Sequence, residues 1–162
     1  QILCGLSYKM RDCIHTAIIP TMQQLLNTEA DTAAFAKKLA PLLNAGDVIY
    51  LEGELGAGKT TFTRHLAHAL GVTGRVKSPT YTLVETYDLP NGLTLHHFDL
   101  YRLAEPREWF SAGFDEYLNE RSIALIEWPS MAAGALPAAD WVLTLGYVSE
   151  NVRELNIQQK AG

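Results

Sequence analysis

Residues 48–66 read VIYLEGELGAGKTTFTRHL, and three patterns follow one another in this stretch. The apolar run 48–51 is typical of a strand that is buried on both faces. The segment 53–60 matches the phosphate-loop pattern G-x-x-x-x-G-K-[ST]. From Lys59 onward, apolar residues recur at helical spacing at positions 62, 66 and 70. A strand, a glycine-rich loop and a helix in this order predict a P-loop.

Each part of this loop has a physical task in phosphate binding. Gly56 and Gly58 allow the backbone to curl so that successive N–H groups point at phosphate oxygens. The start of the next helix adds free N–H groups and the positive end of its dipole. We expect the Lys59 ammonium to reach the β- and γ-phosphates and the Thr60 hydroxyl to bind Mg²⁺. The alternative is a glycine-rich surface turn before a helix with a lysine at its start.

Two acidic residues are candidates for the second magnesium-side ligand that a P-loop requires. Glu127 directly follows the apolar run 123–126, and Asp99 lies near the end of the expected strand 93–100. Ligands of open α/β sheets bind at the carboxyl ends of the strands, where both acids are expected. The alternatives are a solvated strand-end carboxylate for Glu127, and a helix cap or an ion pair with Arg102 for Asp99.

Three further features are weaker candidates. Trp128, next to Glu127, is interpreted either as lining a nucleotide site or as a core residue. The segment 77–80, Lys-Ser-Pro-Thr, predicts either a loop that senses the γ-phosphate or a plain turn before a strand. His96 and His97 are neighbours on one expected strand, so they point to opposite faces and cannot readily share a metal. We interpret both histidines as structural.

Residues 18–162 are expected to form one α/β P-loop NTPase domain with a mixed, mainly parallel sheet flanked by helices. Residues 1–17 are expected to be an N-terminal extension. The remaining elements follow from periodicity and turn residues. They are an extended lead-in or edge strand at 18–26, helices at about 29–44, 105–110 and 114–120, a hairpin of strands 81–87 and 93–100, and strands at 123–126, 141–145 and 151–159.

Composition narrows the class of protein further. The formal charge of −5 argues against non-specific nucleic-acid binding, which phosphate neutralisation drives. Cys4 and Cys13 fit no zinc template and suggest free thiols in a reducing compartment. No apolar run approaches the ~20 residues that span a bilayer, and the first residues lack a signal-peptide pattern. We therefore expect a soluble, cytoplasmic protein.

Four segments, taken in order, resemble the TsaE family, formerly called YjeE. They are residues 51–61, 76–84, 97–103 and 126–129, and the resemblance extends from about residue 20 to 147. The family is the ATPase component of bacterial threonylcarbamoyladenosine tRNA modification. The resemblance implies ATP with Mg²⁺, ADP as product, and weak intrinsic activity. The absence of a guanine-reading Asn-Lys-x-Asp motif agrees with ATP.

The resemblance also implies partners and site residues. The partners are TsaD and TsaB, which act with TsaC on adenosine 37 of tRNAs that read ANN codons. Hydrolysis would reset that complex, tRNA would be met only through it, and no membrane is involved. The family's catalytic positions correspond to Lys59, Thr80 and Asp99, its magnesium ligands to Thr60 and Glu127, and its nucleotide contacts to Glu54, Leu55, Gly56, Ala57, Gly58, Lys59, Thr60, Thr61 and Trp128.

Two other functions stay open at this level. A small-molecule kinase would need an arginine-rich lid, and its only candidates are the scattered Arg102, Arg107 and Arg121. A nucleotide-gated binding module would use the same loop without useful turnover.

Overall fold

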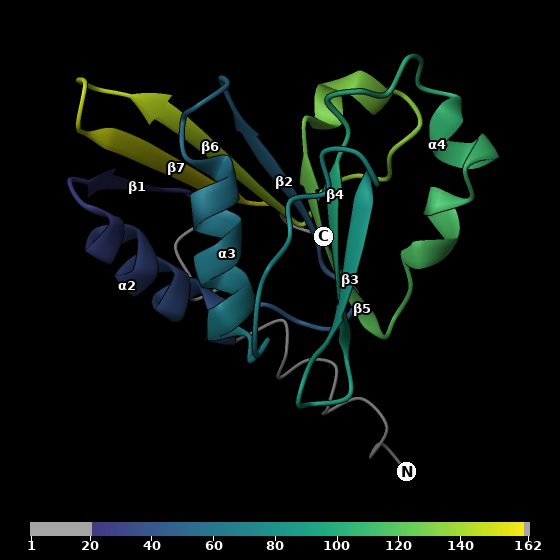
Figure 1. Ribbon diagram of the computed structural model, residues 1–162, viewed down its shortest axis with the longest axis horizontal. Coiled ribbons are helices and arrows are strands. Elements are labelled where there is room, and N and C mark those ends of the chain that lie inside the picture. The colour runs from purple at the N-terminus through teal and green to yellow at the C-terminus, as the bar shows by residue number, and fades with distance from the viewer. Residues whose placement is uncertain (1–20, 161–162) are drawn as a thin grey trace, which may run out of the picture.

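A seven-stranded mixed sheet runs through the molecule in the order β1-β7-β6-β2-β5-β4-β3 (Figure 1). The computed structural model describes residues 21–160, so the expectations for residues 1–17, including Cys4 and Cys13, lie outside the described residues. Strands β6, β2, β5 and β4 are parallel neighbours at the centre. Antiparallel pairing adds β7 and β1 at one edge and β3 at the other, which confirms the predicted mixed sheet. The strands are β1 Thr21–Leu26, β2 Val48–Gly53, β3 Val84–Asp88, β4 Thr94–Asp99, β5 Ser122–Glu127, β6 Trp141–Tyr147 and β7 Arg153–Gln159.

Helices cover both faces of this sheet and enclose two hydrophobic cores (Figure 1). Alternation along β2 divides them, because Ile49 and Leu51 enter one core and Val48 enters the other. The first core packs under α2 (Glu29–Leu39) and α3 (Lys59–Ala69). The second packs under the short α4 (Glu108–Ser111) and the 3-10 turns Phe114–Tyr117 and Pro129–Ala132.

The helix predicted at 29–44 begins as expected but ends early. Thr28 and Asp31 form a capping box, in which the Asp31 N–H donates to Thr28 Oγ1 at 3.2 Å and the Thr28 N–H donates to Asp31 Oδ2 at 3.1 Å. The α-helix ends at Leu39 and continues as the 3-10 turn Ala40–Leu42. Pro41 explains the change, because proline has no N–H to donate to the preceding turn.

The predicted hairpin is present, but its first strand is shorter than expected. Strand β3 begins at Val84, not at residue 81. Leu83 has a left-handed backbone with φ of 65°, and its N–H donates to the Pro79 carbonyl at 2.8 Å. The loop after α3 therefore turns once more before the strand starts. Gly92, with φ of 84°, provides the hairpin turn.

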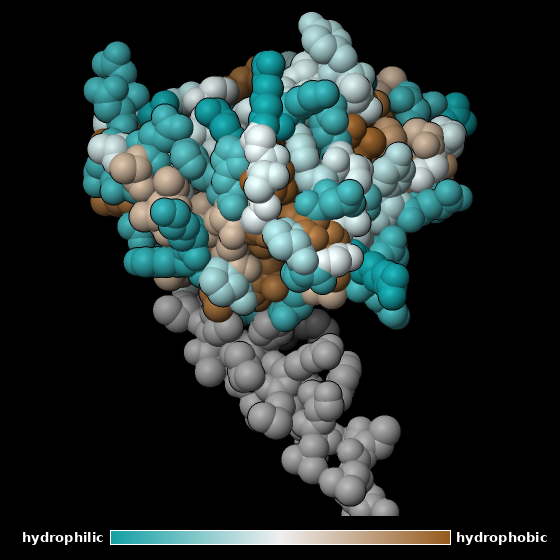
Figure 2. Space-filling view, turned by 60° about the horizontal axis from the view of Figure 1, so that its bottom comes forward, coloured by the Kyte–Doolittle hydropathy of each residue, from teal (hydrophilic) through white to brown (hydrophobic). Residues whose placement is uncertain are grey.

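The predicted helix 105–110 forms only over Glu108–Ser111, and 114–120 forms only a 3-10 turn. Neither α2 nor α3, with 11 residues each, nor any other described helix is long and apolar enough to cross a membrane. Figure 2 shows one face of the molecule, on which polar side chains form most of the surface around a central group of apolar ones.

Candidate functional site

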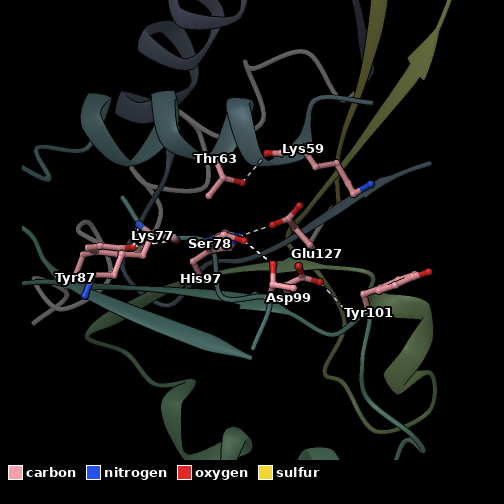
Figure 3. Close-up of polar contacts among 10 residues, drawn as sticks. Lys59, Thr63, Lys77, Ser78, Tyr87, His97, Asp99, Tyr101 and Glu127 are labelled. Atoms are coloured by element: carbon pink, nitrogen blue, oxygen red, sulfur yellow. Dashed lines mark hydrogen bonds and ion pairs between the residues drawn. The ribbon is translucent and has the colours of Figure 1, made fainter. Parts of the chain in front are cut away.

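The glycine-rich loop joins β2 to α3 at the carboxyl ends of the parallel strands (Figure 1). Strand β4 ends at Asp99 and β5 ends at Glu127, and these two residues are paired in the register of the neighbouring strands. Figure 3 shows the side chains of Lys59, Asp99 and Glu127 between the start of α3 and these two strand ends. The prediction that both acids lie at the carboxyl ends of the strands, next to the loop, is confirmed.

The backbone of the loop has the curled form that phosphate binding requires. Gly53, Gly56 and Gly58 have φ values of 150°, 78° and 101°, which only glycine adopts readily. Gly58 is the N-cap of helix α3 and provides no side-chain cap, so the N–H groups of the first turn are available to an anion. Ala57 is buried and anchors the loop in the first core, whereas Leu55 is 63% exposed.

Strand β6 supports the outer side of the loop. A Cβ atom on Gly53 would lie 2.6 Å from the Leu145 carbonyl oxygen, and one on Gly56 would lie 2.9 Å from the Tyr147 hydroxyl. The Tyr147 hydroxyl also donates a hydrogen bond to the Leu55 carbonyl at 3.3 Å. The glycines therefore serve a second purpose, because side chains at these positions would collide with β6.

The Lys59 side chain is buried and held within the loop itself. Its ammonium donates to the carbonyls of Gly53 at 2.5 Å and Glu54 at 2.8 Å. The same ammonium lies 4.5 Å from the centre of the Trp128 ring, which is a cation–π distance. Trp128 thus contacts the key cation of the site and is half-buried, so it is more than a core residue.

Burial changes the titration of two charged groups here. It lowers the pKa of Lys59, and the negative charges of Glu127 and Asp99 act in the opposite direction. Burial also raises the pKa of Asp99; the N–H of Tyr101 opposes this rise and the charge of Glu127 adds to it. The site therefore holds a cation and two carboxylates under partial desolvation, which strengthens their interactions.

Glu127 is deeply buried, so its interpretation as a solvated strand-end carboxylate is wrong. It is 2% exposed, and the His97 Nε2–H donates to its Oε2 at 2.5 Å. His97 is 1% exposed, and its Nδ1 has no hydrogen-bond partner within residues 21–160. Sequence reasoning missed this contact. The signal was the alternation along β4, which places His97 on the same face as Asp99.

His96 faces the other side of the sheet, as predicted. Its Nδ1 is hydrogen-bonded to the Thr86 hydroxyl at 2.9 Å, and its ring meets that of Tyr117 edge-on with centroids 4.9 Å apart. His96 thus has the structural role expected of it, whereas His97 belongs to the site.

Two bulky residues at the site have left-handed backbones. Among the described residues, Leu83 and Trp128 are the only non-glycine residues with positive φ, at 65° and 56°. Such conformations cost about 1–3 kcal/mol each and gather at functional sites. Trp128 directly follows Glu127, and the Leu83 carbonyl accepts the Asp99 N–H at 3.0 Å. The strain is therefore located where the two carboxylates are held.

The loop 77–83 lies beside Asp99 but makes few side-chain contacts to the site. Thr80 is hydrogen-bonded to the Ser78 hydroxyl at 2.7 Å, and no hydrogen bond or ion pair within residues 21–160 joins it to Lys59 or Asp99. Asp99 Oδ1 accepts the Tyr101 N–H at 3.1 Å in a turn, and the next helix, α4, begins only at Glu108, so the alternative of a helix cap is wrong.

The arginines do not form a lid over this site. The Arg102 guanidinium lies 4.7 Å from the Tyr81 ring centre and makes no ion pair with Asp99 in the described part of the chain, so that alternative is wrong. Arg107 pairs with Glu105 at 2.6 Å on the surface. Arg121 precedes β5, at the end of that strand opposite to Glu127. A kinase-type clamp is therefore not formed by these residues.

The donor set fits Mg²⁺ better than a metal held by protein alone. Thr60 is exposed in the first turn of α3, and Glu127 Oε1 accepts no hydrogen bond from the described residues. No cluster of three or more His, Cys, Asp or Glu side chains in the described chain could hold a metal ion. Mg²⁺ takes one or two protein oxygens and completes its shell with phosphate and water, so a hydroxyl and a carboxylate suffice.

A pocket of about 530 Å³ opens directly beside the phosphate loop. Polar residues from the start of α2 and from the β6–β7 connection face residues of the loop and of α3 across it. The lining residues are Leu26, Asn27, Thr28, Glu29, Thr32, Ala57, Gly58, Thr61, Leu145, Glu150, Asn151 and Arg153. Its size lies within the ~300–1,000 Å³ range of small-molecule sites.

Comparison with known proteins identifies the family. The model of the family described as "Threonylcarbamoyl adenosine biosynthesis protein TsaE" matches residues 26–155. The proteins named tRNA threonylcarbamoyladenosine biosynthesis protein TsaE of Haemophilus influenzae and Bacillus subtilis are 43% and 38% identical to this chain over 135 and 125 residues. These alignments cover 80% and 77% of this chain, and 85% and 77% of the respective relatives.

A solved structure has a similar fold. The crystal structure of Bacillus subtilis YdiB superposes with a TM-score of 0.74 at 31% identity, over 89% of this chain and 88% of that one. The family match spans the whole of the site, from the start of α2 through the phosphate loop to both carboxylates. The chain therefore belongs to the TsaE family of threonylcarbamoyl adenosine biosynthesis proteins.

Proposed function

We propose that this chain binds ATP with Mg²⁺ and hydrolyses it slowly to ADP. The observation that carries the proposal is the meeting of Lys59, Asp99 and Glu127 at the carboxyl ends of the parallel strands, next to the glycine loop. A cation for the phosphates, a carboxylate for the metal and a second carboxylate for the chemistry are the parts that phosphoryl transfer to water needs.

The loop and Lys59 bind the phosphates in this proposal. The free N–H groups around Gly58 hold the anion, and the Lys59 ammonium exchanges its two carbonyl contacts for β- and γ-phosphate oxygens. Thr60 and Glu127 would hold Mg²⁺. The ion would supply positive charge that offsets the charge developing on the phosphates during transfer.

Asp99 is the residue for the hydrolytic step. Its pKa is raised by burial, which makes the carboxylate a stronger base than an exposed aspartate. We assign to it the orientation and deprotonation of the attacking water. We also assign to Thr80 a response to the γ-phosphate, which the backbone hydrogen bond between Asp99 and Leu83 in the same loop supports.

The pocket beside the loop is the proposed site of the nucleoside. It continues directly from Ala57, Gly58 and Thr61, so a chain of phosphates on the loop would lead into it. Asn27, Asn151 and backbone groups of the lining supply hydrogen bonds of both kinds to a purine base.

In the cell, the proposed ATPase serves threonylcarbamoyladenosine formation at adenosine 37 of tRNAs that read ANN codons. Membership of the TsaE family supports this placement. Hydrolysis would reset a TsaD–TsaB complex between turnovers, and tRNA would contact the chain only through that complex. The formal charge of −5 agrees with such indirect contact.

The test is a pull-down of purified TsaD and TsaB with this chain, with and without ATP and Mg²⁺, alongside calorimetric binding of ADP and an ATP hydrolysis assay. We expect ATP-dependent capture and faster phosphate release in the assembled complex. Lys59→Glu is the matched control, because it should lose both. Binding of nucleotide without any nucleotide-dependent capture would refute the role in the complex. Absence of Mg-dependent nucleotide binding would refute the ATPase itself.

A further inference from the structure

We propose that His97 is a positioning residue, which fixes the orientation of the Glu127 carboxylate and so sets the affinity of the site for Mg²⁺. The proposal rests on the proposed function above and adds a residue to it. His97 itself touches neither metal nor nucleotide; it acts through the side chain that does.

The contact between His97 and Glu127 is short and buried. His97 Nε2 and Glu127 Oε2 are 2.5 Å apart, and the two side chains are 1% and 3% exposed. The residues come from the adjacent parallel strands β4 and β5, where Glu127 is paired with Asp99, two residues beyond His97. The sheet register therefore fixes both ends of the contact, and the buried carboxylate cannot rotate without breaking it.

This hydrogen bond leaves one carboxylate oxygen for a ligand. Within residues 21–160, Glu127 Oε1 accepts no hydrogen bond, whereas Oε2 is occupied by His97. A side chain that binds a metal is generally oriented by a hydrogen bond to the atom that does not bind the metal. Loss of that hydrogen-bond partner lowers metal affinity about 10–100-fold.

A purely structural histidine would be satisfied on both sides, and His97 is not. Its Nδ1 is the only fully buried side-chain nitrogen or oxygen without a partner among the described residues. Leaving a buried polar atom unpaired opposes folding, so the hydrogen bond from Nε2 to Glu127 is the polar contact, among the described residues, that offsets this cost. His96, one residue earlier, shows the structural alternative, because its Nδ1 is bonded to Thr86 at 2.9 Å and its ring packs on Tyr117.

The experiment compares four variants by calorimetric titration of ADP, once with Mg²⁺ and once with EDTA. His97→Leu removes the donor and keeps the bulk. His97→Gln keeps an amide nitrogen near the place of Nε2, whereas the shorter His97→Asn does not reach it. His96→Leu is the matched control on the same strand, because it alters a buried histidine that faces away from Glu127.

We expect His97→Leu and His97→Asn to weaken the apparent Mg²⁺ affinity about 10–100-fold, while ADP binding in EDTA changes by less than about twofold. His97→Gln should recover most of that affinity, and His96→Leu should keep it even if its melting temperature falls. In a Glu127→Gln background, His97→Leu should cause no further loss, because the two changes remove one interaction.

Two results would overturn the assignment. One is an unchanged Mg²⁺ affinity in His97→Leu or His97→Asn. The other is an equal loss of ADP affinity with Mg²⁺ and with EDTA that His97→Gln does not recover, which marks a role in folding only. If His97→Leu does not fold, the contrast between His97→Asn and His97→Gln decides. Failure of the proposed function looks different, because the wild-type chain itself would then show no Mg-dependent gain in ADP binding.

Discussion

The site is built from two regions that reach an unusual backbone in different ways. In the glycine loop, positive φ angles fall on Gly53, Gly56 and Gly58, which adopt them without strain. At the strand ends, they fall on Leu83 and Trp128, where a side chain opposes them. The backbone of the loop follows from the conformational freedom of glycine. At the strand ends, the packing of neighbouring segments holds Leu83 and Trp128 in a conformation that their side chains disfavour.

The two regions should therefore respond differently to substitution. A change in the glycine loop should act through the backbone shape or the charge of the loop itself. A change at the strand ends should act through burial and hydrogen bonding between elements that are far apart in the chain, such as Asp99 and Glu127. The following substitutions test that distinction, and the first two separate binding from turnover.

Lys59→Glu should have the largest effect. It removes the ammonium that is held beside the loop and places a carboxylate near Asp99 and Glu127. We expect ATP and ADP affinity to fall at least about 100-fold, because a charge-assisted contact is replaced by repulsion. Calorimetric titration measures this loss. Lys38→Glu, on the exposed last turn of α2, is the control, and a similar loss there would contradict a local effect.

Asp99→Asn should separate the strand ends from the loop. We expect nucleotide affinity to be retained and turnover to fall about 100-fold or more, as for loss of a general base. Burial raises the pKa of Asp99, so its ionised form opposes folding, and the variant should melt at a higher temperature than wild type near neutral pH.

The sign of that stability difference can be checked by acidification. As pH falls through the folded-state pKa of Asp99, the wild-type carboxyl is protonated and the advantage of the variant should shrink. Thermal melts across this range measure it, with the exposed Asp88→Asn as control. An advantage that grows on acidification would contradict a raised pKa, and unchanged turnover in the assembled complex would make Asp99 structural.

Gly53→Ala tests whether the loop requires a glycine at this position, both for its positive φ and for its close approach to β6. The new Cβ would lie 2.6 Å from the Leu145 carbonyl oxygen at a backbone φ of 150°. Strain and overpacking together should destabilise the fold by about 2 kcal/mol, a fall of about 4–8 °C in melting temperature. Gly146→Ala, on the neighbouring strand with nothing within 4 Å, should change little. Equal effects at both positions would show that close approach is not the reason for Gly53.

Tyr147→Phe should have the smallest effect and addresses the support of the loop by β6. It removes one hydrogen bond to the Leu55 carbonyl, of 3.3 Å, and keeps the ring. We expect a loss of about 0.5–1 kcal/mol in stability and at most about threefold in ADP affinity. Tyr50→Phe removes a hydrogen bond to the Pro137 carbonyl away from the loop, so it should leave ADP affinity unchanged.

The two regions also differ in how far the sequence alone predicts them. The backbone of the loop could be predicted, because glycines at fixed spacing between a strand and a helix specify its curled form. The parallel centre of the sheet and both edges followed from apolar runs and the Asn-Gly turn. Helix ends and the start of β3 did not, because Pro41 and the left-handed Leu83 act through their contacts with neighbouring segments.

At the strand ends, the sequence predicted that Asp99 and Glu127 lie at the same end of the sheet but not how they are held. The burial of Glu127 and its bond to His97 depend on the register of β4 and β5, which no local pattern encodes. The left-handed Trp128 and its contact with Lys59 have the same origin, since they join segments about 70 positions apart in the chain.

The contact between Lys59 and Trp128 also provides an optical signal. The chain has three tryptophans, of which Trp109 and Trp141 are 1% and 2% exposed within the two cores. Within residues 21–160, Trp128 is the one tryptophan with an ammonium over its ring, at 4.5 Å from the ring centre. Indole emission responds to a charge above the ring, so movement of Lys59 onto a phosphate would change the fluorescence of Trp128 against a constant background. The proposed nucleotide binding should therefore be measurable in the unlabelled protein, in real time and with its own residues as the reporter.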